Sequence, residues 1–354
     1  PAQGGSPQDY FNTVLWTGDN SAGRSIGGVG FQPDWVWIKG RNADWNHHVV
    51  DSVRGGNTYL TTSTTGAEAS SGSGNEIIST LDSDGFSLAT STTNGNSNNS
   101  GSTYVGWNWK AGTAFSNDAS ATSVGTIDSA GSVSADTGFS IISYTGTGVT
   151  ATVAHGLGVA PDMILIKNRD NATYNWVVYH SANTSAPETD YLRLNTTDAT
   201  ADYTMWNDTA PTSSVFSIAY DWIYKSSDAH IAYCFASVDG YSKFGSYTGN
   251  DNADGPFVYT GFRPAFVMIK DITVAGYWIM YDSKRDNINF AYKKLAANDT
   301  GVESTNASLG NIDFLSNGFK IRDNSNDSHA GQVDGATPIF MAFAEQPFKY
   351  ANAR

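Results

Sequence analysis

The sequence contains a single cysteine, Cys234, among its 354 residues. One thiol cannot form a disulfide within the chain, so stability has to come from packing or from assembly. Cys234 falls in an apolar stretch, and we interpret it as a small buried residue and not as a reactive thiol. No apolar run approaches the roughly 20 residues that cross a bilayer, so membrane insertion is not expected.

Charged residues are also scarce, and the basic ones are the scarcer kind. They make up 15% of the chain, with 20 Lys and Arg against 34 Asp and Glu, which gives a formal net charge of −14. Binding to nucleic acid or to an anionic membrane surface requires clustered Lys and Arg, because these side chains neutralise phosphates. The composition therefore argues against both partners.

Motifs with known chemistry are lacking as well. The chain has no G-x-S-x-G elbow, phosphate-binding loop, HExxH or paired-cysteine motif. The adjacent His47 and His48 would point to opposite faces of a strand and cannot hold one metal from one side. A glycosidase needs two carboxylates about 5–10 Å apart in a cleft, and the many Asp residues in turns do not single out a pair. We therefore predict no enzyme activity, no catalytic residue, no metal site and no cofactor. Alternating oxygen-bearing side chains at 323–327 leave calcium binding open there, although the Gly and the closing Glu of an EF-hand loop are absent.

What the sequence does contain is one short motif in three copies, here called the repeated phrase. Each copy has a glycine and a proline, then a short apolar run, then a lysine; the copies are residues 30–39, 158–167 and 261–270. Proline can begin a strand without losing a ladder hydrogen bond, and the apolar run has the length of a strand buried on both faces. We expect Lys39, Lys167 and Lys270 to end these strands at water.

Further landmarks recur around each copy in the same order. An aromatic-Thr-Gly precedes the phrase; a tryptophan-containing strand, a lone leucine and an alternating strand follow it. The repeat is about 100 residues long, which is the size of a domain. We predict an all-β fold of three tandem related antiparallel β-sandwich domains at residues 10–110, 138–237 and 243–348. Residues 111–137 read as an Ala/Ser/Gly linker with one edge strand near 123–127. Trp107 and Trp109 of the alternating strand are expected in the core.

One group of aromatic residues is not explained by the repeat. Tyr203, Trp206, Asn207 and Asp208 are interpreted as a loop insertion confined to the second repeat. An aromatic ring beside an amide and a carboxylate can stack on a sugar while the polar groups bind hydroxyls. These four residues are the candidate ligand-binding site. Contact with another subunit, or packing of the loop on its own sandwich, are the alternatives.

Several of the repeated segments resemble the sequences of a known family. The segments at 30–39, 51–55, 81–86, 104–112 and 342–350 resemble a repeated domain of virion-associated structural proteins of marine tailed bacteriophages. The likeness spans nearly the whole chain and implies a tail-fibre, tail-tip or capsid-decorating protein. It brings no catalytic residues, and the second repeat departs from it most, lacking the segment matched by 51–55.

These observations lead to one functional expectation with alternatives. The expectation is a non-enzymatic virion protein, an exposed tail fibre or appendage component that contributes to host-surface attachment. Its partners would be other virion proteins, further copies of itself (trimers are common in fibres) and a host surface glycan. A capsid-decorating or tail role without receptor contact, and a secreted carbohydrate-binding protein or polysaccharide depolymerase, are the alternatives.

Overall fold

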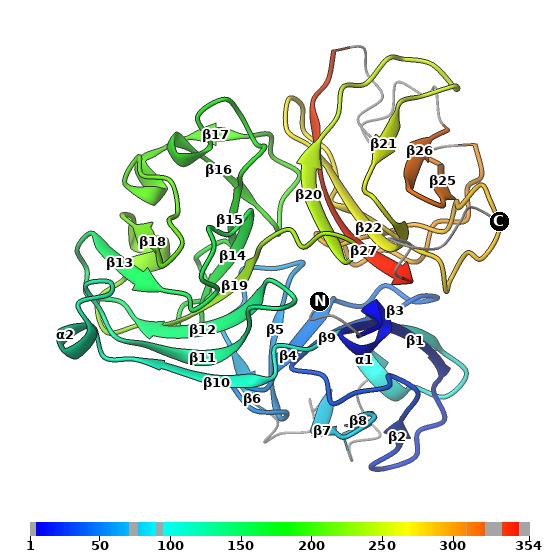
Figure 1. Ribbon diagram of the computed structural model, residues 1–354. Helices are drawn as coiled ribbons and strands as arrows, with labels where there is room; N and C mark the ends of the chain where they lie inside the picture. The colour runs from blue at the N-terminus through cyan, green and yellow to red at the C-terminus, as the bar shows by residue number, and fades with distance from the viewer. Residues whose placement is uncertain (1–4, 71–76, 90–94, 309, 323–334, 347–354) are drawn as a thin grey trace.

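The computed structural model describes residues 5–70, 77–89, 95–308, 310–322 and 335–346. These residues build antiparallel sheets joined by turns and by helices of three or four residues, so the predicted all-β class is confirmed. No helix in the described ranges is long and apolar enough to cross a membrane. Three lobes surround a common centre, with the first repeat in blue and cyan, the second in green and the third in yellow to red (Figure 1).

The lobes are here called units 1, 2 and 3, and each contains a large sheet and a small sheet. Unit 1 contains η1 Pro7–Asp9, β1 Phe11–Thr17, β2 Ser25–Ile26, β3 Trp35–Gly40, β4 His48–Asp51, β5 Thr58–Thr61, β6 Ala69–Ser70, β7 Ile78–Asp82, β8 Gly85–Leu88, α1 Gly95–Asn98 and β9 Thr103–Trp109. Unit 2 contains β10 Thr113–Asn117, α2 Ala119–Thr122, β11 Ser129–Ser134, β12 Phe139–Thr145, β13 Ala151–Ala154, β14 Met163–Asn168, β15 Val177–His180, η2 Pro187–Thr189, β16 Asp190–Arg193, β17 Ala201–Asp202, η3 Thr204–Trp206, β18 Val215–Ile218, α3 Asp221–Tyr224 and β19 Ala229–Phe235. Unit 3 contains β20 Ser242–Ser246, β21 Phe257–Tyr259, β22 Arg263–Asp271, β23 Ile279–Asp282, β24 Leu295–Ala296, β25 Ile312–Leu315, β26 Gly318–Ile321 and β27 Pro338–Gln346.

The large sheets share one strand order. The last strand of each unit lies between the unit's early strand and the strand of the repeated phrase: β9 between β1 and β3, β19 between β12 and β14, and β27 between β20 and β22. The registers agree as well, because Trp35, Met163 and Phe266 face Trp109, Phe235 and Phe343 respectively. Each unit therefore closes by pairing segments that are far apart in its sequence.

The segment predicted as a linker is part of the sheet of unit 2. Within residues 111–137, β10 pairs with β11 and β11 pairs with β12, which extends the large sheet to eight strands. The edge strand expected near 123–127 is wrong, since the strands flank that segment and only an isolated bridge at Ile127 falls within it. Small Ala, Ser and Gly side chains can line a sheet edge as well as a linker, so composition did not separate the two.

Along the strands of the repeated phrase, successive side chains point alternately into two different hydrophobic cores. Trp35 and Trp37 of β3 point into a core shared by all three units, whereas Val36 and Ile38 pack against the small sheet of unit 1. Units 2 and 3 divide their corresponding strands in the same way; β3 and β14 are buried along their whole length, and β22 is buried from Phe266 onward. The predicted two-sided burial is confirmed. Its inner side, however, is covered by the other two units.

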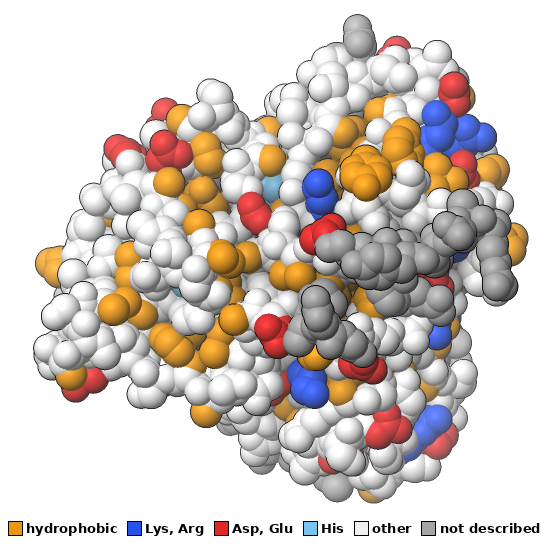
Figure 2. All heavy atoms as spheres, viewed as in Figure 1, with side chains coloured by type: hydrophobic (Ala, Val, Ile, Leu, Met, Phe, Trp, Pro, Cys, Tyr) orange, Lys and Arg blue, Asp and Glu red, His pale blue; other side chains and the backbone are white. Residues whose placement is uncertain are grey.

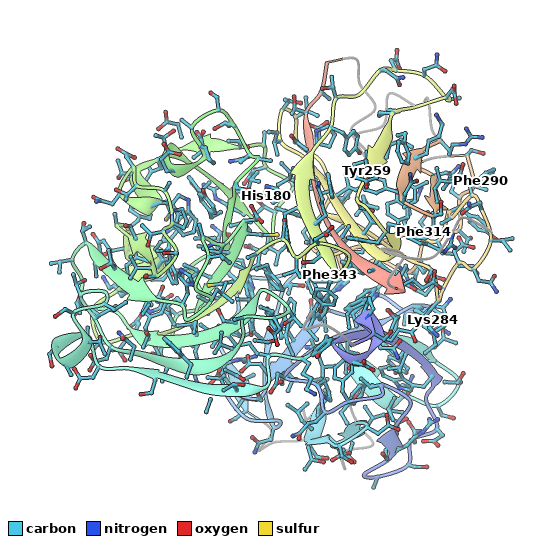
Figure 3. All side chains as sticks on the ribbon, viewed as in Figure 1. His180, Tyr259, Lys284, Phe290, Phe314 and Phe343 are labelled. Carbon is cyan, nitrogen blue, oxygen red and sulfur yellow. The ribbon has the colours of Figure 1, made fainter. Side chains whose placement is uncertain are left out.

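Aromatic rings meet at the centre of the molecule. The Phe343 ring of unit 3 lies 5.2 Å from Phe11 of unit 1 and 6.1 Å from Phe235 of unit 2, measured between ring centroids. Figure 3 shows Phe343 where the three lobes converge. Trp107 and Trp109 also belong to this shared core and are completely buried, as expected. The inner faces of the three large sheets therefore form one hydrophobic core.

The small sheet of unit 2 lacks a strand that the other units have. β7 and β25 form the third strand in units 1 and 3, and in them Leu81 and Phe314 face Phe86 and Phe319. In unit 2 the residue at the same spacing before Phe216 is Pro211, which has no N–H to donate to a ladder. The segment around Pro211 forms no strand, and η3 lies just before it. The distance from the lone leucine to this phenylalanine is the same in units 2 and 3, so the predicted loop insertion is wrong: the connection is refolded and not lengthened.

Candidate functional site

The charged side chains that would be natural candidates for chemistry are used at the boundaries between units. Where unit 1 meets unit 2, Asp51 binds Arg54 at 2.5 Å and accepts the hydroxyl of Tyr233 at 2.7 Å. Glu68 bridges Arg54 and Arg169 at 3.2 and 2.8 Å. Burial opposes the charge of Arg54, but its two carboxylate partners and Tyr233 outweigh burial and raise its pKa. Burial likewise opposes the charge of Glu68, but the two arginines lower its pKa.

The boundary between units 3 and 1 repeats this network with matching residues. Asp282 binds Arg285 at 2.5 Å and accepts the indole N–H of Trp107 at 3.0 Å. Glu303 bridges Arg285 and Arg41 at 3.0 and 2.8 Å. The side chains of Arg285 and Asp282 are fully buried, so each charge depends on the other to remain in the interior. Both networks therefore hold neighbouring units together.

The boundary between units 2 and 3 has the same geometry without the charges. His180 occupies the position of Asp51 and Asp282, and its Nε2 lies 3.1 Å from the carbonyl of Phe340. Thr200 donates its hydroxyl to Asn183 at 2.6 Å, where the other two boundaries have a Glu–Arg pair. The backbone N–H of Thr200 donates to the Ile272 carbonyl, as the N–H groups of Glu68 and Glu303 donate across the other two boundaries. Burial lowers the pKa of His180 to about 4, so the ring is neutral at neutral pH.

The three lysines of the repeated phrase do not reach water, and that prediction is wrong. Lys39, Lys167 and Lys270 are buried, and each donates to the backbone carbonyl of the residue that follows it. Lys39 also reaches the Thr300 carbonyl of unit 3 at 3.0 Å, and Lys270 reaches the Thr197 carbonyl of unit 2 at 3.3 Å. Burial lowers the pKa of each lysine to about 8. The amines of Lys39 and Lys270 therefore tie loops of neighbouring units to the strands, whereas Lys167 ties a loop of its own unit, at the Asn171 carbonyl.

The four residues predicted as a ligand site divide into buried and exposed groups. Trp206 is buried: its indole donates to the Asp190 carbonyl at 3.0 Å and its ring packs edge-on against Tyr179. Asn207 and Asp208 are exposed and adopt the left-handed backbone region, which Asn and Asp tolerate better than most residues. Tyr203 is 44% exposed. Packing of the loop on its own unit therefore accounts for Trp206, and of the two aromatic residues only Tyr203 is presented to solvent.

Tyr203 belongs to a cluster that we call the aromatic surface, defined by Tyr191, Arg193, Tyr203, Tyr220 and Trp222. Tyr203 is exposed, Tyr191 is buried and the other three are half-buried. The Tyr203 and Tyr220 rings are 4.6 Å apart, and Tyr220 lies 5.4 Å from Trp222. The guanidinium of Arg193 lies over both the Tyr191 and the Trp222 rings, at 5.4 and 5.2 Å. It also binds the Tyr191 hydroxyl at 2.8 Å and Asp198 at 2.6 Å.

This cluster forms because η3 and α3 lie beside β16 in unit 2. Met205 and Trp206 of η3 fill the space under the missing strand, and Ile223 anchors α3 to the same core. The rings of Tyr220 and Trp222 then lie at the boundary with solvent, half-buried. At the position of Arg193, counted from the lone leucine, unit 1 has Thr61 and unit 3 has Ala296, so the guanidinium is specific to unit 2.

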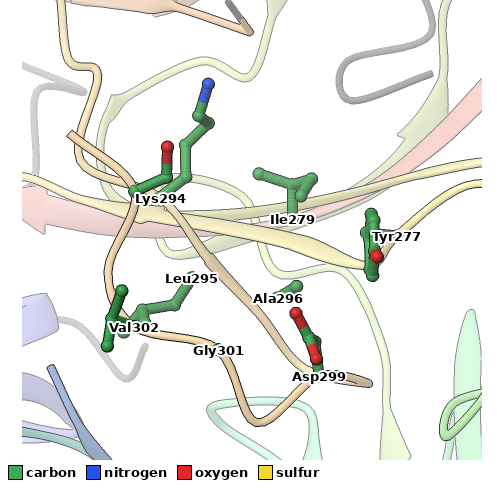
Figure 4. Close-up of a pocket in the computed structure, with 9 residues that line it drawn as sticks. Tyr277, Ile279, Lys294, Leu295, Ala296, Asp299, Gly301 and Val302 are labelled. Carbon is green, nitrogen blue, oxygen red and sulfur yellow. The ribbon is translucent and has the colours of Figure 1, made fainter. Parts of the chain in front are cut away.

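A separate pocket of about 230 Å³ lies in unit 3 beside β23 and β24 (Figure 4). The ring of Tyr277 and the carboxylate of Asp299 lie on one side of it, and Val302 lies on the other. Among the described residues that line it, Asp299 is the only carboxylate, so these residues do not supply the acid pair that glycoside hydrolysis uses. On the face shown in Figure 2, charged side chains are few and hydrophobic ones are spread among uncharged ones.

Comparison with known families identifies one match. The model of a family described as a domain of unknown function, DUF7483, matches residues 6–347. The chain belongs to this family. No curated protein and no solved structure matches it. The family match covers all three units, which fits a body built around one shared core.

Sequence reasoning found part of the aromatic surface and missed the rest. The repeat does not explain Tyr203, which singles it out in the sequence. Tyr191 and Arg193 lie in the strand β16, and Trp222 follows Arg193 by 29 positions, so only the folded chain brings them together. The signal that was available is an arginine where the other repeats have small residues. The candidate calcium segment 323–327 lies outside the described residues.

Proposed function

We propose that this protein is a non-enzymatic structural component of a virion, an exposed fibre or appendage part that contributes to host attachment. The observation that carries the proposal is the use of the charged and aromatic side chains. The Asp–Arg–Glu–Arg networks and the central rings are buried between units, where they hold three lobes in one body. The resemblance of the repeats to virion-associated phage proteins supports placing the protein on a phage particle.

The architecture fits a part that must withstand mechanical and chemical stress outside a cell. Each unit closes by non-local strand pairing and then shares its inner face with both neighbours. A single chain supplies a three-lobed body, so a second or third copy is not needed to complete its core. Among the described residues, no three His, Cys, Asp or Glu side chains gather as a metal cluster would, and the buried carboxylates Asp51 and Asp282 are paired with arginine.

The proposal is tested on purified particles. Antibody raised against the chain should label the particle at one kind of appendage in electron micrographs, and the same antibody should slow adsorption to host cells. Absence of the protein from purified particles would overturn the proposal. Labelling of the capsid shell with unchanged adsorption would favour the decorating role and remove the attachment part.

A further inference from the structure

We propose that the aromatic surface of unit 2 binds a neutral glycan, with Tyr203 and Trp222 as the rings that contact the sugar. This inference names a ligand for the attachment role proposed above and in that respect rests on it. The faces of a pyranose ring carry C–H groups that pack on aromatic rings, while the hydroxyls around its rim need hydrogen-bond partners. The aromatic surface offers both kinds of group within one cluster.

The exposed face of Tyr203 is not needed to close the core of unit 2, although Tyr220 and Trp222 pack partly against that core. Trp206 and Met205 already fill the space left by the missing strand, and both are buried. Tyr203 nevertheless keeps 44% of its surface exposed while it packs edge-on against Tyr220. A large ring held in place by another ring, and still open to solvent, is pre-organised for contact and loses little freedom on binding.

The polar part of the cluster is also held in place before any ligand arrives. Arg193 lies over two rings and is fixed by hydrogen bonds to Tyr191 and Asp198. A guanidinium and a carboxylate beside aromatic rings can donate to and accept from vicinal hydroxyls. Such a mixture of ring edges and polar atoms suits a sugar better than an apolar protein side chain, which would cover the remaining donor and acceptor positions of Arg193 and Asp198 without bonding to them.

The charges on the surface select the kind of glycan. The positive charge of Arg193 is balanced by Asp198 at 2.6 Å, so the cluster has no net attraction for an anion. The whole chain carries a formal charge of −14, which repels sulfated, sialylated or uronate-rich polymers. The expected ligand is therefore a polysaccharide of neutral hexoses.

The test measures binding of the full chain to a panel of neutral polysaccharides, namely glucans, mannans and galactans, by calorimetry and by quenching of tryptophan fluorescence. At least one should bind, and Tyr203→Ala and Trp222→Ala should each weaken that binding at least tenfold. Tyr259→Ala is the matched control, because Tyr259 is a 60% exposed tyrosine on unit 3 and should leave binding unchanged. Trp222→Phe, which keeps a ring and the fold, should lose less affinity than Trp222→Ala.

Several results would overturn the inference. They are no binding to any member of the panel, binding only to acidic polymers, or binding that ignores both Tyr203→Ala and Trp222→Ala in folded protein. Failure of the virion role is recognised separately. A chain present in particles that binds no neutral glycan overturns only this inference, and a chain that binds glycan but is absent from particles overturns only the proposed function.

Discussion

Truncation of Phe343 tests whether the three units form one cooperative body. This ring is 1% exposed and contacts Phe11 of unit 1, Phe235 of unit 2 and Phe266 of its own unit. Phe343→Ala removes its packing at the centre and leaves a cavity that three rigid sheets cannot easily fill. The expected loss of unfolding free energy is about 3–5 kcal/mol, the usual range for a buried phenylalanine.

The shift in melting temperature reveals how much of the chain unfolds together. Unfolding entropy near the melting temperature is about 2.1 cal/mol/K per residue, or roughly 0.7 kcal/mol/K if all 354 residues unfold as one. A loss of about 4 kcal/mol then lowers Tm by about 5–6 °C. If unit 3 unfolded alone, with about 100 residues, the same loss would lower its Tm by roughly 20 °C.

Differential scanning calorimetry and urea unfolding distinguish these cases. One transition that moves by about 5–6 °C, with a urea slope appropriate to the whole chain, is the result expected for a shared core. Tyr259→Ala, an exposed aromatic truncation in the same unit, should move Tm little. Separate transitions, only one of which responds to Phe343→Ala, would refute the shared-core reasoning.

Three further predictions follow from the boundaries and turns. Asp51→Ala should cost about 3–5 kcal/mol in urea unfolding, because it removes the nearer of the two carboxylates that pair with the buried Arg54 guanidinium. Burial lowers the pKa of His180 and His230 to about 4, so as the pH falls the unfolded chain binds protons on these histidines before the folded chain does. The contribution of the two histidines to the free energy of unfolding is therefore fully present above pH 6.5 and should fall by up to about 3 kcal/mol per histidine between pH 6.5 and 4. Gly85→Ala should lower Tm, since an added Cβ would lie 2.0 Å from the carbonyl oxygen of Ile26 and the backbone φ is +143°.

Each of these predictions has a control. For Asp51 it is Asp198→Ala, which removes an exposed ion-pair partner and should cost less than about 1 kcal/mol; equal losses would contradict the buried-network argument. For the histidines it is His180→Asn, which should remove about half of the decline because His230 still titrates; an unchanged profile would mean that other groups cause it. For Gly85 it is Gly101→Ala, where φ is also positive but no atom lies within 4 Å, so only backbone strain remains.

The sequence by itself determined the β class and the alternation of the repeated phrase. These follow from local chemistry, because Gly and Pro punctuate the chain and branched or aromatic residues favour strands. Trp107 and Trp109 could be assigned to a core on that basis. Tyr203 could be singled out because the repeat left it unexplained.

Only the tertiary structure decided what those elements face. Lys39 looks like the polar end of a strand, yet a loop of unit 3 covers it and supplies a carbonyl 3.0 Å from its amine. Arg54 and Glu68 look like surface charges, yet unit 2 buries them. Arg193 and Trp222 are 29 positions apart in sequence and meet only when α3 packs beside β16. The burial and pairing of a side chain, and its place in a surface cluster, depend on which distant segment packs against it. No local sequence pattern specifies that segment.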